Sequence, residues 1–590
     1  MDERLSVRHL APIPRKQVTD YTGLDSLTTA YTADDIGGGL LICTTGHLGN
    51  SSMRQPDELS NDNPLEWSSG TGNQVWQMFT LSRTGDLDKL KRLVAAHPAL
   101  VECQFAYRTP LYFAVRENHV EIVRYLLAAG ANPVGLMIND SLIEISQDRG
   151  YREMEQLLTR WIHGTEVPSH AGEMLAHAIR EHDLEKLTQL LDYHPEWIGA
   201  RDDGSNEPIH WATMTRQPQI IDFVLQRGAS IEAQRLDGAR PLQLFHGDYH
   251  FRGRSRVSRD WPHTPEDILQ HLLSRGAYYD MCTACMMGNV DRVRELLSQD
   301  PTAANRLSDF RTYYPGSGSP LYNAAQGGYL EIVKLLLASG ADPNLAEPGI
   351  APRGRALYSA IVEGHHELAE ILLKAGSVAN QSVESSADAL SRAISNNDQR
   401  AINLLCTHGA SRSVELLAYY GDLLTGAAVF AANPQLADDP IAFANAAGEG
   451  QDAFVHLMLR YCPDLPNKVE FPSWLVAAKN PEINRLLFRL GMDPNRSDWL
   501  GVTPMHTIAG KGRIDLAELF IEHGGRLDLC DETILSTPLG WAANFGQLEM
   551  VRYLLERGAP RRQTEVPDWA QPIEWAKRKN HLQIVDLLSR

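Results

Sequence analysis

The chain has 590 residues, of which 43% are hydrophobic and 22% charged, as in ordinary water-soluble globular proteins. Its formal net charge of −19 disfavours non-specific nucleic-acid binding as the main activity. Seven scattered cysteines argue against a disulfide framework, and no stretch approaches the roughly 18 consecutive apolar residues of a membrane span. We therefore expect a cytoplasmic protein that binds neither nucleic acid nor membrane.

Residues 1–74 differ in composition from the rest of the chain. Ser, Thr, Asn and Asp dominate, and no helical period is present. We expect an irregular or partly disordered N-terminal segment with a short strand at Leu40–Thr44. Packing of this segment back onto the residues that follow is an open alternative.

From residue 75 onward the sequence repeats itself about every 33 residues, which is typical of a solenoid. Four copies, at 108–133, 318–344, 502–528 and 536–560, begin with Ser or Thr, then Pro, then Leu or Met. Small residues, a Gly or Asn and an I-V-x-x-L-L pattern follow, and most copies close with Gly-Ala. Weaker copies between them bring the array to about fifteen or sixteen units.

The pattern of one copy predicts two short helices. Thr109 caps the first helix and Pro110 occupies its first turn, where the missing N–H costs nothing. In the second helix Ile122 and Leu126 recur on one face, and Gly130 ends the helix in a left-handed conformation. Because one helix pair cannot bury its own apolar face, the units must stack.

This repeat resembles the ankyrin-repeat family. The residues that carry the resemblance are Thr109-Pro110-Leu111, Ser319-Pro320-Leu321, Thr503-Pro504-Met505-His506, Thr537-Pro538-Leu539 and the Gly-Ala closures. The resemblance covers roughly residues 75–590 and implies an all-α repeat solenoid with β-hairpin fingers and a concave groove. Proteins of this family usually bind other proteins through that groove, and the family has no catalytic motif. Residues 139–164 and 415–439 fit the pattern poorly.

An insertion at residues 246–263 interrupts one unit. It replaces the turn between a first helix that begins at Pro241 and a second helix capped by Thr264. Tyr249, Phe251 and Trp261 within it argue against disorder, because disordered segments are poor in large rings.

The insertion carries one candidate catalytic or metal-binding set. His246, Asp248 and His250 alternate along the chain, so an extended backbone places all three side chains on one side. Two imidazoles and a carboxylate are a known ligand set for zinc or non-haem iron. The alternative is that these residues only make hydrogen bonds within a loop, and apart from this divalent metal we expect no cofactor.

Arginines and aromatic rings near the insertion are candidates for binding an anionic ligand or an acidic partner. Guanidinium groups suit carboxylate and phosphate, and stacked units place their fingers side by side. The alternatives are a solvated basic loop and rings that merely pack between fingers. The candidate ligand-binding residues are Tyr249, Arg252, Arg254, Trp261, Tyr313, Tyr314 and Arg353.

Two other patterns have structural interpretations. Cys282 and Cys285 resemble a redox or metal pair, but they align with small-residue and His positions of the repeat, and no second such pair exists. His210 and His506 occupy the position where the family places a locally hydrogen-bonded histidine.

These observations favour a non-catalytic, monomeric interaction scaffold. It would bind another protein, with an acidic or anionic surface, through the concave groove and the long fingers of residues 206–360. The alternative is an enzyme or a binder of a small molecule or anion, with a pocket formed by the 246–263 insertion.

Overall fold

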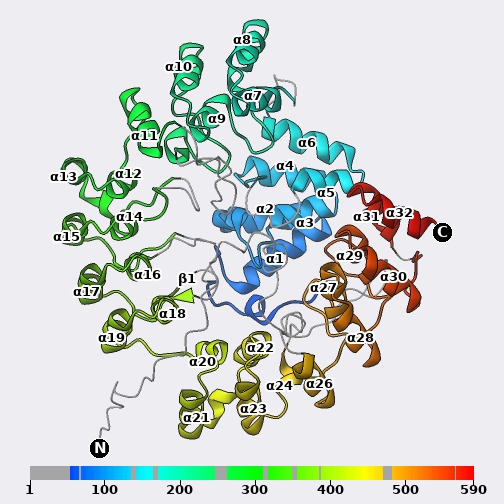
Figure 1. Ribbon diagram of the computed structural model, residues 1–590. Helices are drawn as coiled ribbons and strands as arrows, with labels where there is room; N and C mark the ends of the chain where they lie inside the picture. The colour runs from blue at the N-terminus through cyan, green and yellow to red at the C-terminus, as the bar shows by residue number, and fades with distance from the viewer. Residues whose placement is uncertain are drawn as a thin grey trace, which may run out of the picture.

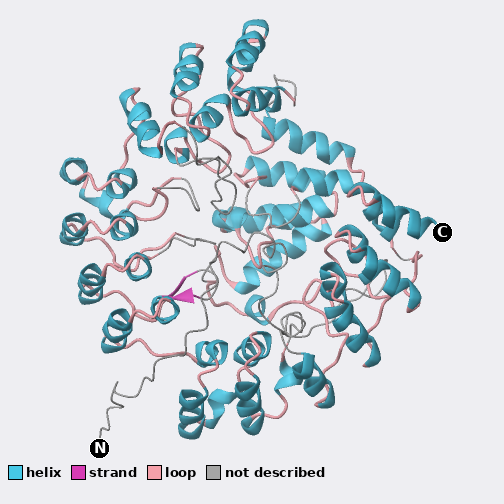
Figure 2. Cartoon of the chain, in the orientation of Figure 1, coloured by secondary structure: helices cyan, strands magenta, loops and turns pink. Residues whose placement is uncertain are grey.

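The computed structural model describes residues 53–65, 68–134, 141–163, 170–245, 262–309, 316–347, 355–383, 387–469, 481–564 and 566–590. The described residues form a helical repeat solenoid in which each unit contributes a first and a second helix (Figures 1 and 2). The strand predicted at Leu40–Thr44 lies outside the described residues.

First helices of consecutive units pack against one another on the inner side of the array (Figure 1). They are α1 (Gly72–Thr84), α3 (Pro110–Arg116), α5 (Leu142–Asp148), α7 (Ala171–Arg180), α9 (Pro208–Met214), the 3-10 helix η6 (Pro241–Leu244), α12 (Met281–Met286), α14 (Pro320–Gln326), α16 (Ala356–Val362), α18 (Ala389–Ser395), α20 (Val414–Tyr420), α22 (Pro440–Gly448), α27 (Pro504–Lys511), α29 (Pro538–Asn544) and α31 (Pro572–Arg578).

Second helices form the outer layer. They are α2 (Leu87–Ala96), α4 (Val120–Ala128), α6 (Arg152–His163), α8 (Leu184–Tyr193), α10 (Pro218–Gln226), α11 (Pro265–Ser274), α13 (Val290–Gln299), α15 (Leu330–Ala338), α17 (His366–Lys374), α19 (Gln399–Thr407), α21 (Leu423–Ala432), α23 (Asp452–Tyr461), α26 (Pro481–Arg489), α28 (Ile514–Glu522), α30 (Leu548–Glu556) and α32 (Leu582–Ser589).

Short helices complete the chain. They are α24 (Leu465–Lys468) and the 3-10 helices η3 (Asp57–Ser60), η4 (Pro98–Glu102), η5 (Pro195–Gly199), η7 (Pro301–Asn305), η9 (Pro434–Ala437) and η10 (Asp568–Ala570). In the part of the chain that the structure describes, no helix is long and apolar enough to cross a bilayer.

The predicted caps are present. The Thr109 hydroxyl accepts a hydrogen bond from the Tyr112 amide at 3.2 Å, and Ser319 caps α14 in the same way. Gly130 follows α4 with a φ of 102°, a conformation that only glycine adopts at low cost. Thr264 caps α11, where its hydroxyl and the Asp267 carboxylate each accept from the other's amide.

The two stretches that fitted the repeat poorly in sequence are ordinary units. Ser141 and Glu144 form a capping box at the start of α5, so the cap that residues 139–164 were expected to lack is present. Residues 414–432 form the pair α20 and α21, with Ser413 and Asp422 as caps. Consensus matching failed there because Ser141 and Ser413 are not followed by Pro.

The fingers are the segments that connect the second helix of one unit to the first helix of the next. Their described residues hold one antiparallel strand pair, β1 (Ser382–Val383) with β2 (Ala387–Asp388), and an isolated bridge at Phe105–Arg108 (Figure 2). A second isolated bridge, Pro64–Thr71, lies before α1. β-Hairpins throughout the array are therefore not confirmed.

In three fingers the turn is held by a buried aspartate side chain and not by strand pairing. The Asp498 carboxylate accepts from the amides of Leu500 and Val502 at 2.9 and 2.7 Å. Asp202 and Asp531 hold their turns in the same way. The residue after each aspartate is thereby presented at the tip of the turn.

Asparagine side chains tie neighbouring units together. The Asn344 amide donates to the Gly376 carbonyl at 3.0 Å, and its oxygen accepts from the Val378 amide at 2.9 Å. This satisfies groups that the C-terminus of α17 would otherwise leave open. The same two bonds recur at Asn305, Asn380 and Asn495.

The described part of the N-terminal segment packs back onto the first unit. Met53 and Leu59 are buried in the same core cluster as α1. Gly72 touches this segment closely, since a Cβ there would lie 1.9 Å from the Glu58 carbonyl oxygen. Of the two expectations for residues 1–74, packing onto the first repeats therefore holds for residues 53–65.

The array curls until its last units contact its first. In Figure 1, α31 lies beside α5, and Arg578 of α31 forms an ion pair with Asp148 of α5 at 3.1 Å. Trp499 and Leu500, in the finger before α27, belong to the core cluster of the first three units. The two ends of the solenoid thus share one core.

Candidate interaction surface

Every predicted site residue lies outside the described part of the chain. These residues are His246, Asp248, Tyr249, His250, Arg252, Arg254 and Trp261 of the insertion, and Tyr313, Tyr314 and Arg353 of the next long fingers. Their predicted roles stay predictions. The described residues that flank them show how the fingers are anchored.

Two fingers, the one between α10 and η6 and the one between η7 and α14, are joined by a pair of ion pairs that we call the finger bridge: Glu232, Arg240 and Asp309. The Arg240 guanidinium donates to both oxygens of Asp309 at 2.8 and 2.6 Å, and it lies 3.2 Å from Glu232. These hydrogen bonds lower the pKa of the Asp309 carboxyl. Arg240 directly precedes η6 and Asp309 lies between η7 and α14, so the bridge ties the bases of these two fingers together.

The short finger between them is also attached to the bridge. The Tyr278 amide donates to Glu232 at 2.7 Å, while the Tyr278 side chain is 58% exposed. Asp280, at the start of α12, is partly buried, and loss of solvation raises the pKa of its carboxyl. An exposed tyrosine above a rigid charged base is typical of a protein-binding surface.

A buried polar chain connects this surface to the preceding finger. Asp202 accepts from the Trp211 indole N–H at 2.6 Å and from the Asn206 side-chain amide at 3.1 Å. Asn206 in turn accepts from Arg235 at 2.9 Å, and Arg235 pairs with Asp237 at 3.0 Å. Because each group is held by its neighbour, the fingers from residue 200 to 240 are rigidly oriented.

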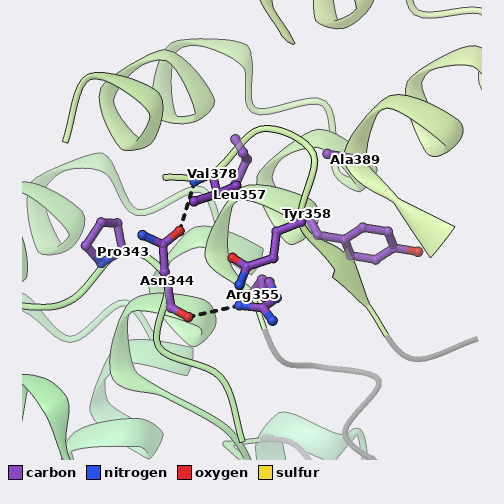
Figure 3. Close-up of a pocket in the computed structure, with 8 residues that line it drawn as sticks. Pro343, Asn344, Arg355, Leu357, Tyr358, Val378 and Ala389 are labelled. Atoms are coloured by element: carbon purple, nitrogen blue, oxygen red, sulfur yellow. Dashed lines mark hydrogen bonds between the residues drawn. The ribbon is translucent and has the colours of Figure 1, made fainter. Parts of the chain in front are cut away.

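A small hollow lies at the base of the finger before α16. It encloses about 240 Å³ of space open to solvent and is lined by Pro343, Asn344, Arg355, Leu357, Tyr358, Val378, Gln381 and Ala389 (Figure 3). Arg355 donates to the Asn344 carbonyl at 3.1 Å, as a dashed line in Figure 3 shows. Burial raises the pKa of the Tyr358 phenol. The hollow is too small for a drug-sized ligand.

Cys282 and Cys285 are buried side chains of α12. The Cys282 thiol lies 3.5 Å from the Gly318 carbonyl oxygen, and burial raises the pKa of both thiols. His506 makes the equivalent contacts in its unit, with Nε2 3.1 Å from the Leu529 carbonyl oxygen. The structural interpretation of the cysteine pair is consistent with this geometry.

His210 behaves as the repeat pattern predicts. Its Nδ1 accepts from the Glu207 amide at 2.9 Å and its Nε2 lies 3.0 Å from the Ala233 carbonyl oxygen. Complete burial lowers its pKa to about 3, so the ring is neutral at physiological pH. Among the described residues no cluster of three or more potential metal ligands occurs.

Comparison with known families identifies the units. A model described as ankyrin repeats in three copies matches residues 264–347 and 473–566, and a single ankyrin-repeat model matches residues 107–136. The chain contains ankyrin repeats. Between these matches, the described residues continue the same alternation of first and second helices.

Curated proteins match parts of this ankyrin array. Human palmitoyltransferase ZDHHC13 is 25% identical over 196 residues, which is 32% of this chain and 29% of that protein. The rice protein named probable E3 ubiquitin-protein ligase XBOS32 is 26% identical over 198 residues, 29% of this chain and 39% of its own length. Rat palmitoyltransferase ZDHHC17 is 39% identical over 75 residues, 13% of this chain and 12% of that protein. The chain spans well under half the length of each relative.

Sequence reasoning did not single out Arg240, Asp309 or Glu232. Arg240 occupies the position before Pro241 where other units carry a Ser or Thr cap. That departure from the usual Ser or Thr cap was the available signal. Its partner, Asp309, lies 69 residues away and has no local pattern.

Proposed function

We propose that this ankyrin protein is a non-catalytic interaction scaffold that binds another protein through the long fingers of residues 206–360. The observation that carries the proposal is the finger bridge, which orients consecutive fingers as one surface. A rigid set of tips loses little conformational entropy on binding, which favours recognition of a protein surface.

The chemistry of this surface supports a protein partner with acidic groups. Arg240 is already paired, but the predicted arginines of the insertion follow it closely in sequence. Tyr278 provides an exposed ring beside Glu232 of the finger bridge. Tyrosine and arginine are the residue types that dominate interface binding energy.

The test is quantitative affinity capture from native lysate with three forms of the full chain. One is the wild type, one has residues 247–262 shortened to a plain turn, and one carries Arg294→Ala with Glu331→Ala. The last pair is an exposed bridge between the outer helices α13 and α15 and serves as the matched control. We expect a partner retained by the wild type and the control but lost from the shortened form.

A partner captured equally by all three forms would place binding elsewhere and refute the proposal. Adding Arg240→Ala to the wild type should weaken capture at least about tenfold, because the two fingers lose their common anchor.

The enzymatic alternative depends on His246, Asp248 and His250, which lie outside the described residues. Metal analysis of the purified chain tests it directly. Stoichiometric metal that is lost on His246→Ala would favour a metal-dependent pocket over a scaffold.

A further inference from the structure

The inner surface of the first three units forms a second contact region, separate from the finger surface above. We call it the N-terminal dock and define it by Phe79, Arg83, Phe113, Arg116 and Arg149 on α1, α3 and α5. It faces two finger tips of the last units, Trp499-Leu500 and Glu532-Thr533. Arg116 and Glu532 are 416 residues apart in sequence, so this contact is entirely tertiary.

The apolar half of the contact is an aromatic pocket around Trp499. The Trp499 ring lies 6.3 Å from Phe79, 6.2 Å from Phe113 and 5.6 Å from Phe105, measured between centroids. Only 3% of Trp499 is exposed. Its carbonyl oxygen also accepts from the Arg54 amide at 3.0 Å. A tryptophan anchor in a preformed aromatic pocket is typical of peptide recognition.

The ionic half is built around the Glu532 carboxylate. Arg83 donates to one oxygen at 2.9 Å and Arg116 to the other at 3.1 Å. Arg116 also donates to the Glu532 carbonyl at 3.1 Å, and Arg149 donates to the Thr533 carbonyl at 3.3 Å. The dock therefore recognises both a carboxylate and the backbone of an extended segment.

The electrostatics of the dock are unusual for this chain. Three arginines converge on one acidic tip in a protein whose net charge is −19. Arg116 is almost fully buried and also pairs with Glu117 of its own unit at 2.6 Å, so it keeps one carboxylate partner when the tip leaves. Arg83 and the remaining donors of Arg116 make the dock complementary to an acidic ligand.

The tips reach the dock as rigid turns. Asp498 and Asp531 each accept hydrogen bonds from backbone amides of their own turn, so the bonds that shape the turns of Trp499 and Glu532 are internal to those turns. The occupants of the dock are therefore two turn tips that pair with no strand of the first units. A segment of similar chemistry from another molecule can satisfy the same contacts.

We propose that the N-terminal dock is a binding site for an extended acidic segment with an aromatic anchor, supplied by another protein, and that the chain's own finger tips occupy it in cis. An external ligand must displace the tips, which the array holds at a high effective concentration. Binding of such a partner opens the contact between the first and last units.

The test measures binding of a fluorescein-labelled peptide, SDWLGDETI, which joins residues 497–501 to residues 531–534. The open form is the full chain with Trp499→Ala and Glu532→Ala. We expect the peptide to bind the open form at least about tenfold more tightly than the wild type, because the competing tips are gone. Adding Arg116→Ala to the open form should remove this gain.

Two controls make the result specific. The full chain with Glu331→Ala, an exposed acidic residue of α15, should bind the peptide as the wild type does. A peptide carrying the changes Trp499→Ala and Glu532→Lys should not bind the open form. No binding of SDWLGDETI to a folded open form up to about 1 mM overturns the proposal.

If the open form does not fold, the wild type provides the measurement. Excess peptide should then accelerate hydrogen exchange of the amides in residues 498–502 and 531–536, while the control peptide should not. Unchanged exchange overturns the proposal. A wild-type dimer that is lost with Trp499→Ala would assign the dock to a second copy and would also overturn it.

Discussion

Replacing Trp499 by Ala should detach the last units from the first. Trp499 is 3% exposed, and a buried tryptophan removes about 150–250 Å² from water. At about 25 cal/mol per Å² this area corresponds to about 4–6 kcal/mol as an upper estimate. Large aromatic-to-alanine substitutions in cores cost about 3–5 kcal/mol, so we expect the contact to weaken by that amount.

The matched control is Trp499→Phe. Within the described residues the Trp499 indole N–H has no hydrogen-bond acceptor, so phenylalanine loses ring area but no hydrogen bond. We expect a cost below about 1.5 kcal/mol for this variant.

The assay is native-state hydrogen exchange of the amides in α1 and α3, because a repeat array need not unfold in one step. The Ala variant should lower the protection of these amides and leave α14 and α15 unchanged. Equal protection in the Ala and Phe variants, or a loss spread evenly along the array, would refute the view that Trp499 closes the solenoid.

Three further predictions concern single buried groups. Glu532→Gln should lower the free energy of unfolding by about 1.5–3 kcal/mol in guanidinium titrations, since Arg83 and Arg116 lose charge-assisted hydrogen bonds while Arg116 keeps Glu117. The exposed Glu331→Gln should cost under about 1 kcal/mol, and equal costs would contradict the argument. The His210 ring should not titrate between about pH 5 and 8 in NMR spectra. Because folding lowers the pKa of the His210 imidazole to about 3, the unfolded chain binds a proton at a higher pH than the folded chain. The free energy of unfolding should therefore decline below about pH 6.5 by up to about 1.4 kcal/mol per pH unit. A ring that titrates near its ordinary value would exclude this. Gly72→Ala should loosen residues 53–65 and speed their proteolysis, because its Cβ would meet the Glu58 carbonyl at 1.9 Å; cleavage at the wild-type rate would argue against the close contact.

The units were predictable because their determinants are local. A cap such as Thr109, a proline at the next position and a glycine such as Gly130 act within one helix pair, so sequence alone places them. The same reasoning failed at Ser141, where the cap exists without its proline. A consensus therefore underestimates units whose helix starts use a different cap.

The candidate surfaces were harder to predict because their partners are distant. Arg240 meets Asp309 across an intervening finger, and Arg116 meets Glu532 across most of the array. Neither pairing can be recognised from the spacing of residues in the sequence, because each depends on how the curvature of many units adds up. The insertion predicted at 246–263 lies between η6 and α11, and because residues 246–261 are outside the described part of the chain, its roles stay predictions.

The shared core of the first and last units has a consequence for how this chain can change in length. An open array of repeats can gain or lose a unit at small cost, since each unit contacts only its neighbours. Here such an insertion or deletion would shift Trp499 and Glu532 away from Phe113 and Arg116 by the width of a helix pair. The contact between the ends therefore fixes the number of units in this protein, as closure fixes the number of strands in a barrel.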